Sequence, residues 1–469
     1  MRTELLPHQI EAVEKLRKLK VGALFMEQGT GKTRTALELF RIRKNSNKAE
    51  KLIWLCPCSV KQNLKADILK HAADEKTILE SVTICGIETL SSSVRANAYL
   101  LEKAKKNKCM LIVDESLLVK NPRAYRTKNI IKLASQCPYR LILNGTPIGK
   151  NEADLFAQFY ILDWRILGYS TYWSFAANHL ELDDHGKIVR CFNVEYLTKK
   201  IAPYVYQVKK DECLTLPDKK YSREYFYLTD DQYEHYRDCI DVFLSDEVLD
   251  NDAPDCYLYR AFTVLQEVAS GRRVQLQVKK AIHHESFFDT PEKNPRIQIL
   301  LDELQKYRKD EKIVIWTKFQ HEIEDIYKVL QKYKYEVSLF HGGITMRQRI
   351  KNLEKFQTNS NILLANKNCA GFGLNLQFCN NAIYYNNDWS YSTKVQSEDR
   401  LHRLGQKREV NLTDITAAYT IDERILNCLD KKENIIDCLK QQIKDRQSLK
   451  KWLGGEKNDP YWIEDLSEN

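Results

Sequence analysis

The chain of 469 residues is too long for one ordinary hydrophobic core, so we expect two large domains with additional helical material. Its 73 Lys and Arg against 64 Asp and Glu give a formal charge of +9, a mild excess that permits a polyanionic partner without indicating one. No apolar run is long enough to cross a bilayer, and residues 1–7 contain no hydrophobic signal core. We therefore expect no membrane partner and a cytoplasmic location.

Thirteen cysteines are scattered through apolar stretches, and none belongs to a Cys-x-x-Cys pair. This distribution is typical of reduced core residues and not of zinc ligands or a disulfide framework. The adjacent His283 and His284 would point apart on a helix or a strand, so we expect no metal site there.

The N-terminal region has the pattern of a phosphate-binding unit. It predicts an amphipathic helix over residues 5–19, a buried strand over 21–26 and a second helix from Arg34. Two glycines in the loop before Arg34 let successive backbone N–H groups point at anionic oxygens near the positive end of that helix. We predict that this loop cradles the phosphates of ATP, through Gln28, Gly29, Thr30, Gly31, Lys32 and Thr33.

Individual roles follow from the chemistry of these side chains. Lys32 is expected against the β- and γ-phosphates, and the Thr33 hydroxyl is expected to hold Mg²⁺. The strict pattern has Gly at the position of Met26, so this loop is a relaxed version; a helix N-terminus capped by Thr30 is the alternative. Gln9 offers a donor and an acceptor and is a candidate to read the adenine edge, with an ordinary solvated glutamine as the alternative.

Further apolar runs over residues 51–56, 82–85 and 109–113 predict strands of a parallel sheet that is buried on both faces. The third run ends in two carboxylates, Asp114 and Glu115. Downstream of a phosphate loop this pair indicates nucleotide hydrolysis, in which Asp114 holds Mg²⁺ and Glu115 polarises the attacking water. A helix N-cap is the alternative.

The next predicted strand, residues 140–144, ends in a turn that contains Thr146, a candidate sensor of the γ-phosphate; an ordinary glycine-containing turn is the alternative. Motifs in this order and spacing resemble the superfamily-2 helicases, and most closely the compact phage- or bacterial-type members of the Swi/Snf-type translocases. The similarity continues through residues 114–122, but the family usually has His where this chain has Leu117. The contact that couples this motif to the turn is therefore made otherwise here or is weaker.

Residues 151–290 have a more helical pattern, with little catalytic chemistry, and resemble the helical protrusions and linker of that family. Their basic residues are candidates for phosphate contacts, with a solvated helix face as the alternative: Arg272, Arg273, Lys279 and Lys280. Strands are again predicted over residues 312–317, 337–343 and 361–366, without a second phosphate loop.

Residues 396–406 match the family motif Gln-x-x-Asp-Arg-x-His-Arg-x-Gly-Gln almost residue for residue. Arg400 and Arg403 are three residues apart, so on one helix they would share a face and reach the γ-phosphate in the transition state. A surface pair that binds phosphate or carboxylate is the alternative. The resemblance further assigns Gln396 and Thr146 to coupling, and Gly373 in a glycine-containing motif to close approach of the backbone to the nucleotide or DNA.

The expected fold is therefore α/β, with two RecA-like parallel-sheet lobes. We predict lobe 1 over residues 1–150, a helical protrusion and linker over 151–290, lobe 2 with arginine fingers over 291–421, and a C-terminal brace helix and tail over 422–469.

The resemblance implies a DNA-dependent ATPase that uses ATP and Mg²⁺ to move along double-stranded DNA, close to the nucleoid or, for a phage protein, in the host cytoplasm. The alternatives are a strand-separating helicase, which would engage single strands, and an ATP-gated scaffold that recruits a nuclease or replication factor. Candidate DNA contacts are Ser59, Lys61, Lys120, Asn121 and Lys367.

Overall fold

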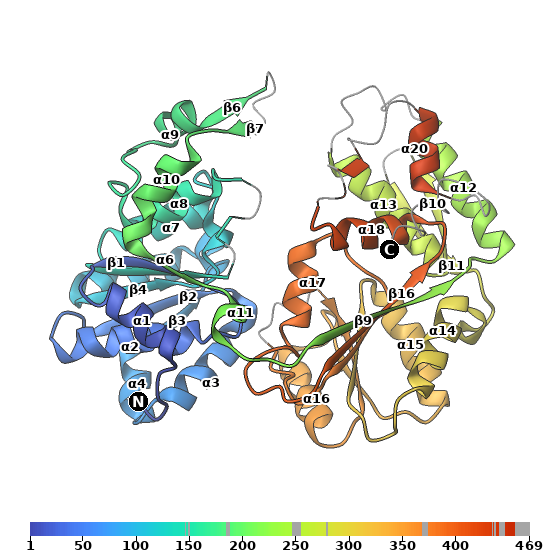
Figure 1. Ribbon diagram of the computed structural model, residues 1–469, viewed down its shortest axis with the longest axis horizontal. Helices are drawn as coiled ribbons and strands as arrows, with labels where there is room; N and C mark the ends of the chain where they lie inside the picture. Colours follow the sequence, from blue (N-terminus) through green and yellow to red (C-terminus); the bar gives the residue numbers. More distant parts are fainter. Residues whose placement is uncertain are drawn as a thin grey trace. The chain divides into compact units, whose positions relative to one another are not determined.

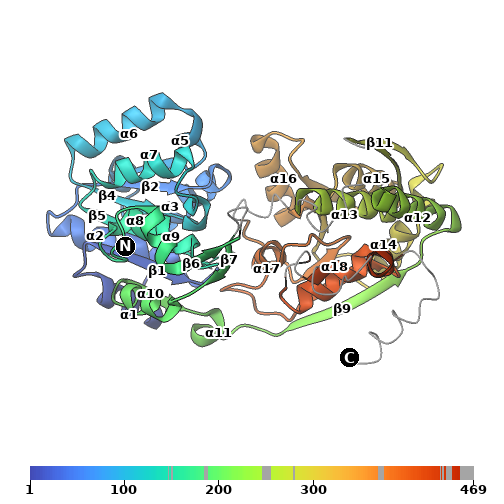
Figure 2. The same ribbon diagram turned by 90° about the horizontal axis from the view of Figure 1, so that it is seen from above.

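The computed structural model describes residues 1–145, 147–148, 151–183, 188–245, 255–277, 280–367, 374–433, 435, 438–439 and 446–454. The chain forms two compact units, one that runs from Met1 to Leu216 and one that starts at Pro217 (Figures 1 and 2). No helix in these described parts is long and apolar enough to cross a membrane.

The first unit contains a six-stranded parallel sheet in the order β3-β2-β4-β5-β1-β8. The five strands predicted from the apolar runs of the first 150 residues are confirmed. The strands are β1 (Val21–Met26), β2 (Lys51–Cys56), β3 (Val82–Gly86), β4 (Cys109–Val113), β5 (Tyr139–Asn144) and β8 (Val205–Val208).

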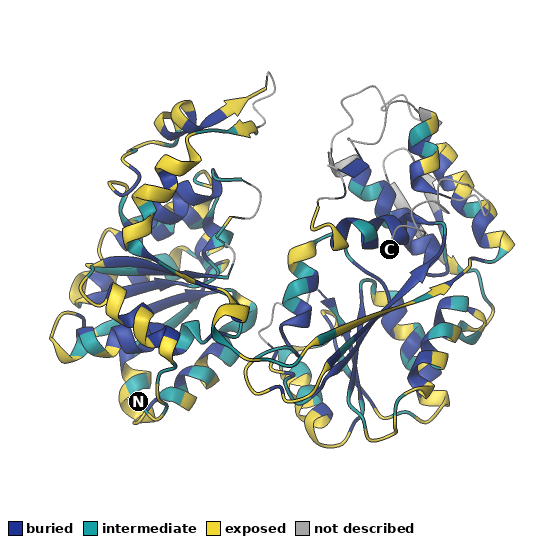
Figure 3. Cartoon of the chain, viewed as in Figure 1, coloured by how far each residue is buried: buried dark blue, intermediate teal, exposed yellow. Residues whose placement is uncertain are grey.

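Helices cover both faces of this sheet, and the side chains of each strand, which point alternately to the two faces, pack against them. On β1, Leu24 and Met26 belong to the core with the first three long helices, whereas Ala23 and Phe25 belong to the core on the opposite face, where Phe25 meets the ring of Phe159 edge-on. Figure 3 shows the buried strands between helices with exposed outer faces. The helices are α1 (Pro7–Leu16), α2 (Lys32–Asn45) and α3 (Lys61–His71) on one face, and α6 (Val94–Lys106), α7 (Tyr125–Ala134) and α8 (Asp154–Asp163) on the other.

The middle region is divided between the two units and does not form a unit of its own. Helices α9 (Tyr172–His179) and α10 (Val194–Ile201) and the hairpin of β6 (Leu180–Leu182) and β7 (Ile188–Cys191) belong to the first unit. Strand β9, helices α12 (Asp230–Ser245) and α13 (Asp255–Ala269), and the ribbon of β10 (Arg272–Gln277) and β11 (Lys280–Ser286) belong to the second. The division falls at Leu216 and not near the expected boundary at Thr290, because strands from this region complete both sheets.

The second unit contains a six-stranded parallel sheet in the order β13-β14-β12-β15-β16-β9. Its strands are β9 (Lys219–Phe226), β12 (Ile313–Thr317), β13 (Val337–Phe340), β14 (Ile362–Asn366), β15 (Asn381–Tyr384) and β16 (Val410–Ala417). Its helices are α14 (Pro295–Gln305), α15 (Gln320–Lys332), α16 (Met346–Thr358), α17 (Tyr391–Glu398), α18 (Ile421–Asp430) and α20 (Arg446–Leu453), besides α12 and α13. A strand-helix alternation is thus present in both units, as expected for an α/β protein with two RecA-like lobes.

The prediction of a single brace helix in the C-terminal segment, residues 422–469, is wrong. Helix α18 ends at Asp430, and Lys432 has a φ of 58°, a left-handed backbone that cannot continue a helix. The packing role is confirmed, since Ile425 is buried in the second core and the ring of Trp452 lies 5.9 Å from that of Phe262.

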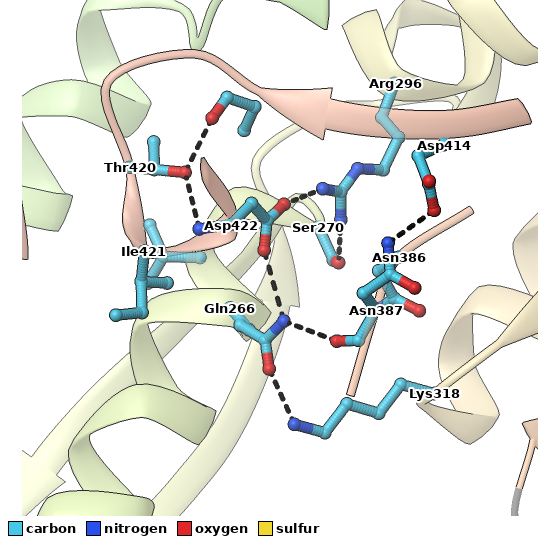
Figure 4. A network of polar contacts seen from close by, with 12 residues as sticks. Gln266, Ser270, Arg296, Lys318, Asn386, Asn387, Asp414, Thr420, Ile421 and Asp422 are labelled. Carbon is cyan, nitrogen blue, oxygen red and sulfur yellow. Dashed lines mark hydrogen bonds and ion pairs between the residues drawn. The ribbon is translucent and has the colours of Figure 1, made fainter. Parts of the chain in front are cut away.

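A buried polar network anchors α18 (Figure 4). Arg296, which is 0% exposed, pairs with Asp422 and donates to Ser270 Oγ at 2.8 Å. Gln266 Nε2 donates to Asp422 Oδ1 at 3.1 Å and to the Asn387 carbonyl oxygen at 2.9 Å. The network therefore joins α13, α14 and α18 to the chain that follows β15.

We expect Asp422→Ala to lower the free energy of unfolding by about 3–5 kcal/mol, because it leaves the Arg296 guanidinium buried without its charge partner. Urea denaturation followed by tryptophan fluorescence measures this change. Lys293→Ala is the control, since its ion pair with Asp289 is exposed and should contribute at most about 1 kcal/mol. Equal losses in the two variants would contradict the assignment of the buried pair.

Candidate functional site

The loop between β1 and α2 has the backbone geometry expected of a phosphate cradle. Gly29 and Gly31 both have a φ of 89°, the left-handed region that strongly favours glycine. A Cβ on Gly31 would lie 2.1 Å from Gln9 Nε2, so a side chain there would also collide with α1. The loop leads into the first turn of α2, whose N–H groups have no partners within the helix and therefore favour an anion.

Two side chains of α1, His8 and Gln9, contact the backbone of this loop. Gln9 Nε2 donates to the Thr30 carbonyl oxygen at 3.1 Å, and Gln9 Oε1 accepts from the Leu6 N–H at 3.1 Å. His8 Nε2 lies 2.8 Å from the same Thr30 oxygen. The buried Gln9 amide thus supports the loop backbone, and its predicted contact with an adenine edge stays a prediction.

Lys32 and Thr33 form the start of α2, which begins two residues before the predicted helix start at Arg34. Lys32 Nζ donates to the carbonyl oxygens of Met26 at 2.8 Å and Glu27 at 3.4 Å, which hold the ammonium at the end of β1. The Thr33 hydroxyl is hydrogen-bonded to the carboxylate of Asp67 on α3. Burial opposes ionisation of Asp67, but hydrogen bonds from His71 and Thr33 outweigh burial, so the pKa of Asp67 is below its usual value.

The acidic pair lies at the carboxyl end of β4. Burial, and then the neighbouring Glu115, raise the pKa of the Asp114 carboxyl well above its ordinary value, while Lys32 opposes the shift. Glu115 has a φ of 49°, an unusual backbone for a residue with a side chain and of the kind that clusters at functional sites. Strand β5 lies between β4 and β1, and a Cβ on Gly145 just after β5 would be 3.8 Å from Lys32 Nζ. The loop, the acidic pair and this turn therefore meet at one sheet edge.

The donor set fits Mg²⁺ bound with a triphosphate. A half-buried carboxylate that resists ionisation gains from a divalent cation, and Asp114 and the Thr33 hydroxyl supply the oxygen ligands that Mg²⁺ prefers. The described residues contain no group of three or more His, Cys, Asp or Glu side chains that could hold a metal by themselves. Ligands from phosphates and water would therefore complete the coordination.

Two residues that the sequence analysis did not single out contribute to the loop. Glu27 accepts from the Lys210 N–H at 2.8 Å, and its own N–H donates to the Val208 carbonyl oxygen at 3.1 Å, which attaches the loop to the end of β8. Asp67 orients the Thr33 hydroxyl. The sequence carries no local signal for either contact, because the partners come from separate elements of the fold.

The two arginines do not lie on one helix, which corrects the predicted geometry. Helix α17 ends at Glu398, and Arg400 and Arg403 lie in the turn that follows, which reaches Gly405 with a φ of 102°. The Arg400 carbonyl oxygen accepts from the Leu376 N–H at 3.0 Å, so this turn packs against the end of the glycine-containing motif. Of the two predicted coupling residues, Gln396 lies on α17, and Thr146, like Gly373, lies outside the described residues.

Lys367 is not a surface DNA contact, which is a second correction. It is 2% exposed, its Nζ donates to Asn387 Oδ1 at 2.9 Å, and it lies over the Tyr384 ring at 4.7 Å. Burial, and then Lys394, lower its pKa to about 7. An ammonium that is enclosed by protein acceptors cannot also contact a phosphate on the surface.

The other four candidate DNA contacts lie on the first unit. Ser59 is in the short turn Cys58–Val60, and Lys61 begins α3. Lys120 pairs with Asp154 at 3.3 Å, and Asn121 Oδ1 accepts from the Arg123 N–H at 2.9 Å. All four retain partly or fully exposed positions, and their contact with DNA stays a prediction.

Two family models match the chain. The SNF2-related domain matches residues 75–273, and the helicase conserved C-terminal domain matches residues 295–405. The matched ranges begin after the phosphate loop, so the assignment of the loop depends on the geometry described above.

Known proteins that resemble the chain include helicases and a chromatin-remodelling factor. An uncharacterised ATP-dependent helicase of Mycoplasma genitalium is 23% identical over 92% of the chain and 41% of its own length. The uncharacterised ATP-dependent helicase YqhH of Bacillus subtilis is also 23% identical, over 94% of the chain and 80% of its own length. The chain is 27% identical to the CHD3-type chromatin-remodeling factor PICKLE of Arabidopsis thaliana, over 72% of the chain but only 24% of that protein.

Among solved structures, the SWI2/SNF2 ATPase core of Sulfolobus solfataricus in complex with double-stranded DNA aligns over 97% of both chains, with a TM-score of 0.40 and 22% identity.

We expect Gly31→Ala to abolish binding of a fluorescent ATP analogue, because the substitution combines about 1–2 kcal/mol of left-handed strain with a collision against Gln9. Nucleotide titration measures the loss. Gly168→Ala is the matched control, since Gly168 has a φ of 88° and nothing within 4 Å of a Cβ. Binding by the Gly31→Ala variant with the affinity of the parent protein would argue against the cradle.

Proposed function

The chain belongs to the Snf2-related group of the superfamily-2 helicases, and from this premise we propose that it is an ATPase that moves along double-stranded DNA. The observation that carries the proposal is the sheet edge where Lys32, Asp114 and Glu115 meet beside a two-glycine loop. This combination is what phosphoryl transfer from a bound nucleotide requires.

In the proposed reaction, the loop N–H groups and Lys32 bind the phosphates of ATP, and Lys32 moves from its carbonyl partners onto the β- and γ-phosphates. Thr33 and Asp114 would hold Mg²⁺, which neutralises the charge that develops on the phosphates. Glu115 orients and polarises the water that attacks the γ-phosphate. Arg400 and Arg403 supply further positive charge in the transition state, as guanidinium groups do in related chemistry.

DNA is proposed as the partner that couples hydrolysis to motion. Relatives named as ATP-dependent helicases and as a chromatin-remodelling factor support this proposal, and the formal charge of +9 is compatible with a polyanion. Ser59, Lys61, Lys120 and Asn121 are the proposed phosphate contacts on the first unit. Because the chain spans 41% and 24% of two of these relatives, substrates and protein partners of the longer proteins are not transferred to it.

Two rivals of this proposal are separable by assay. A strand-separating helicase of the same family would release a labelled strand from a duplex, whereas a translocase on duplex DNA would displace the third strand of a triplex without separating the other two. A static scaffold that recruits a nuclease or replication factor would do neither. The set of Lys32, Asp114 and Glu115 at one edge favours an active motor over a scaffold.

We expect duplex DNA to raise the ATPase rate more than single-stranded DNA, RNA or no polymer. Lys32→Ala and Arg403→Ala should each lower the stimulated rate by at least about 100-fold, because each removes positive charge from the phosphates. A coupled phosphate-release assay measures the rates. Lys15→Ala, at an exposed position on α1, is the control and should keep the parent rate. Equal rates with and without polymer would overturn the translocase proposal.

Glu115→Gln should keep nucleotide binding but lower the hydrolysis rate at saturating ATP by about 100-fold or more, since the amide cannot polarise water as a carboxylate does. Binding is measured with a fluorescent nucleotide and hydrolysis under single-turnover conditions. The exposed Glu102→Gln on α6 serves as the control. Parallel losses of binding and hydrolysis would assign Glu115 to the fold of the loop and not to chemistry.

A further inference from the structure

A buried hydrogen bond joins the acidic motif to the helix that follows the turn after β5. The Ser116 hydroxyl donates to Gln158 Oε1 on α8 at 2.6 Å, and both side chains are 0% exposed. Ser116 directly follows Glu115, the residue with the left-handed backbone. In this environment a hydroxyl and an amide without partners would each carry a large desolvation cost, so the bond is strongly specified.

The other end of the Gln158 amide reaches the turn itself. Gln158 Nε2 donates to the Pro147 carbonyl oxygen at 2.7 Å and to the Asp154 carbonyl oxygen at 2.8 Å. The amide therefore uses its oxygen for one partner and both N–H groups for two others. Pro147 belongs to the same turn as Gly145, where a Cβ would be 3.8 Å from Lys32 Nζ.

We propose that Gln158 is a positioning residue for ATP hydrolysis, which fixes the turn of Gly145 and Pro147 relative to the acidic pair through Ser116. The family resemblance placed a polar coupling contact at the position of Leu117, whose apolar side chain cannot make one. Ser116, Gln158 and Pro147 provide a continuous hydrogen-bonded path between the same two segments, within the first unit. This inference deepens the proposed function and rests on it.

The path constrains two segments that approach the nucleotide from different strands. The acidic pair follows β4, and the turn follows β5, so main-chain pairing holds the strands but not the loops beyond their ends. A rigid link between these loops keeps Glu115 and the turn in one geometry, and small displacements at such positions lower a chemical rate steeply. The contacts that hold the loop before α2 come from α1 and the end of β1 and do not include this link, so we expect ground-state nucleotide binding to be kept without it.

The test compares Gln158→Met with the double variant Ser116→Ala/Gln158→Met. Methionine has a similar volume, has no donor and offers only a weak thioether acceptor, and the double variant also removes the hydroxyl that would lose its amide partner. The double variant should therefore regain part of the thermal midpoint that Gln158→Met loses, since the Ser116 hydroxyl is gone while the Pro147 carbonyl oxygen still lacks its donor. We expect both to lower kcat by about 10- to 100-fold while KM for ATP stays within about twofold.

Thr127→Val is the matched control. The Thr127 hydroxyl is also fully buried in the first unit and donates to the Val119 carbonyl oxygen at 3.2 Å, close to the acidic motif but away from the turn. It should lower the thermal midpoint, because a buried hydrogen bond of the first unit is lost, without changing kcat. A purely structural role for Gln158 would instead make kcat follow stability across all three variants.

The proposal is overturned if the double variant keeps a kcat within about threefold of the parent, or if KM rises in step with the fall in kcat. Because kcat is measured with and without duplex DNA, this failure is separable from failure of the translocase proposal. If the parent protein hydrolyses ATP equally fast with and without DNA, the translocase proposal is wrong. The kcat values of the parent and the variants without DNA can still be compared to test the positioning role of Gln158. If Gln158→Met alone does not fold, the double variant decides the result.

Discussion

The parallel pairing of β1, β5 and β4 is the constraint on which the candidate nucleotide site depends. The carboxyl ends of parallel strands lie at the same edge of the sheet, so the loop after β1, the acidic pair after β4 and the turn after β5 are brought together. More than 80 residues separate the loop from the acidic pair in the chain. The pairing also explains the electrostatics. Lys32 stabilises the charged form of Asp114, whereas burial and Glu115 oppose it, and a cation bound with phosphates would resolve that conflict.

Strand pairing does not hold the loops beyond the strand ends, and side chains and backbone groups of α1, α3 and the end of β8 hold the phosphate loop instead. Gln9 and His8 hold the Thr30 carbonyl from α1, Glu27 attaches the loop to the end of β8, and Asp67 orients the Thr33 hydroxyl. These contacts use buried or half-buried polar groups whose partners lie in separate elements. A preorganised phosphate site of this kind loses little entropy when the nucleotide binds.

The second unit uses buried charge differently. Arg296 and Asp422 form a pair with Ser270 and Gln266 that fixes α18 and the preceding helices to the sheet (Figure 4). Lys367 is enclosed in a similar way by acceptors that follow β15. Such groups are costly to bury, and removal of one partner leaves an uncompensated buried charge, so alternative arrangements of the helices are disfavoured.

The sequence by itself determined the apolar strands, the glycine loop before α2 and the position of Asp114 and Glu115 at a strand end, because each of these is a local pattern of burial or backbone freedom. Only the tertiary structure decided that the polar, largely exposed β9 completes the second sheet, that Arg400 follows a helix instead of lying on it, that Lys367 is buried, and that Gln158 links the acidic motif to the turn. These outcomes depend on partners far away in the chain. A lysine or a glutamine has the same local sequence signal whether it faces water or a buried carbonyl, so its role is set by what the fold places beside it.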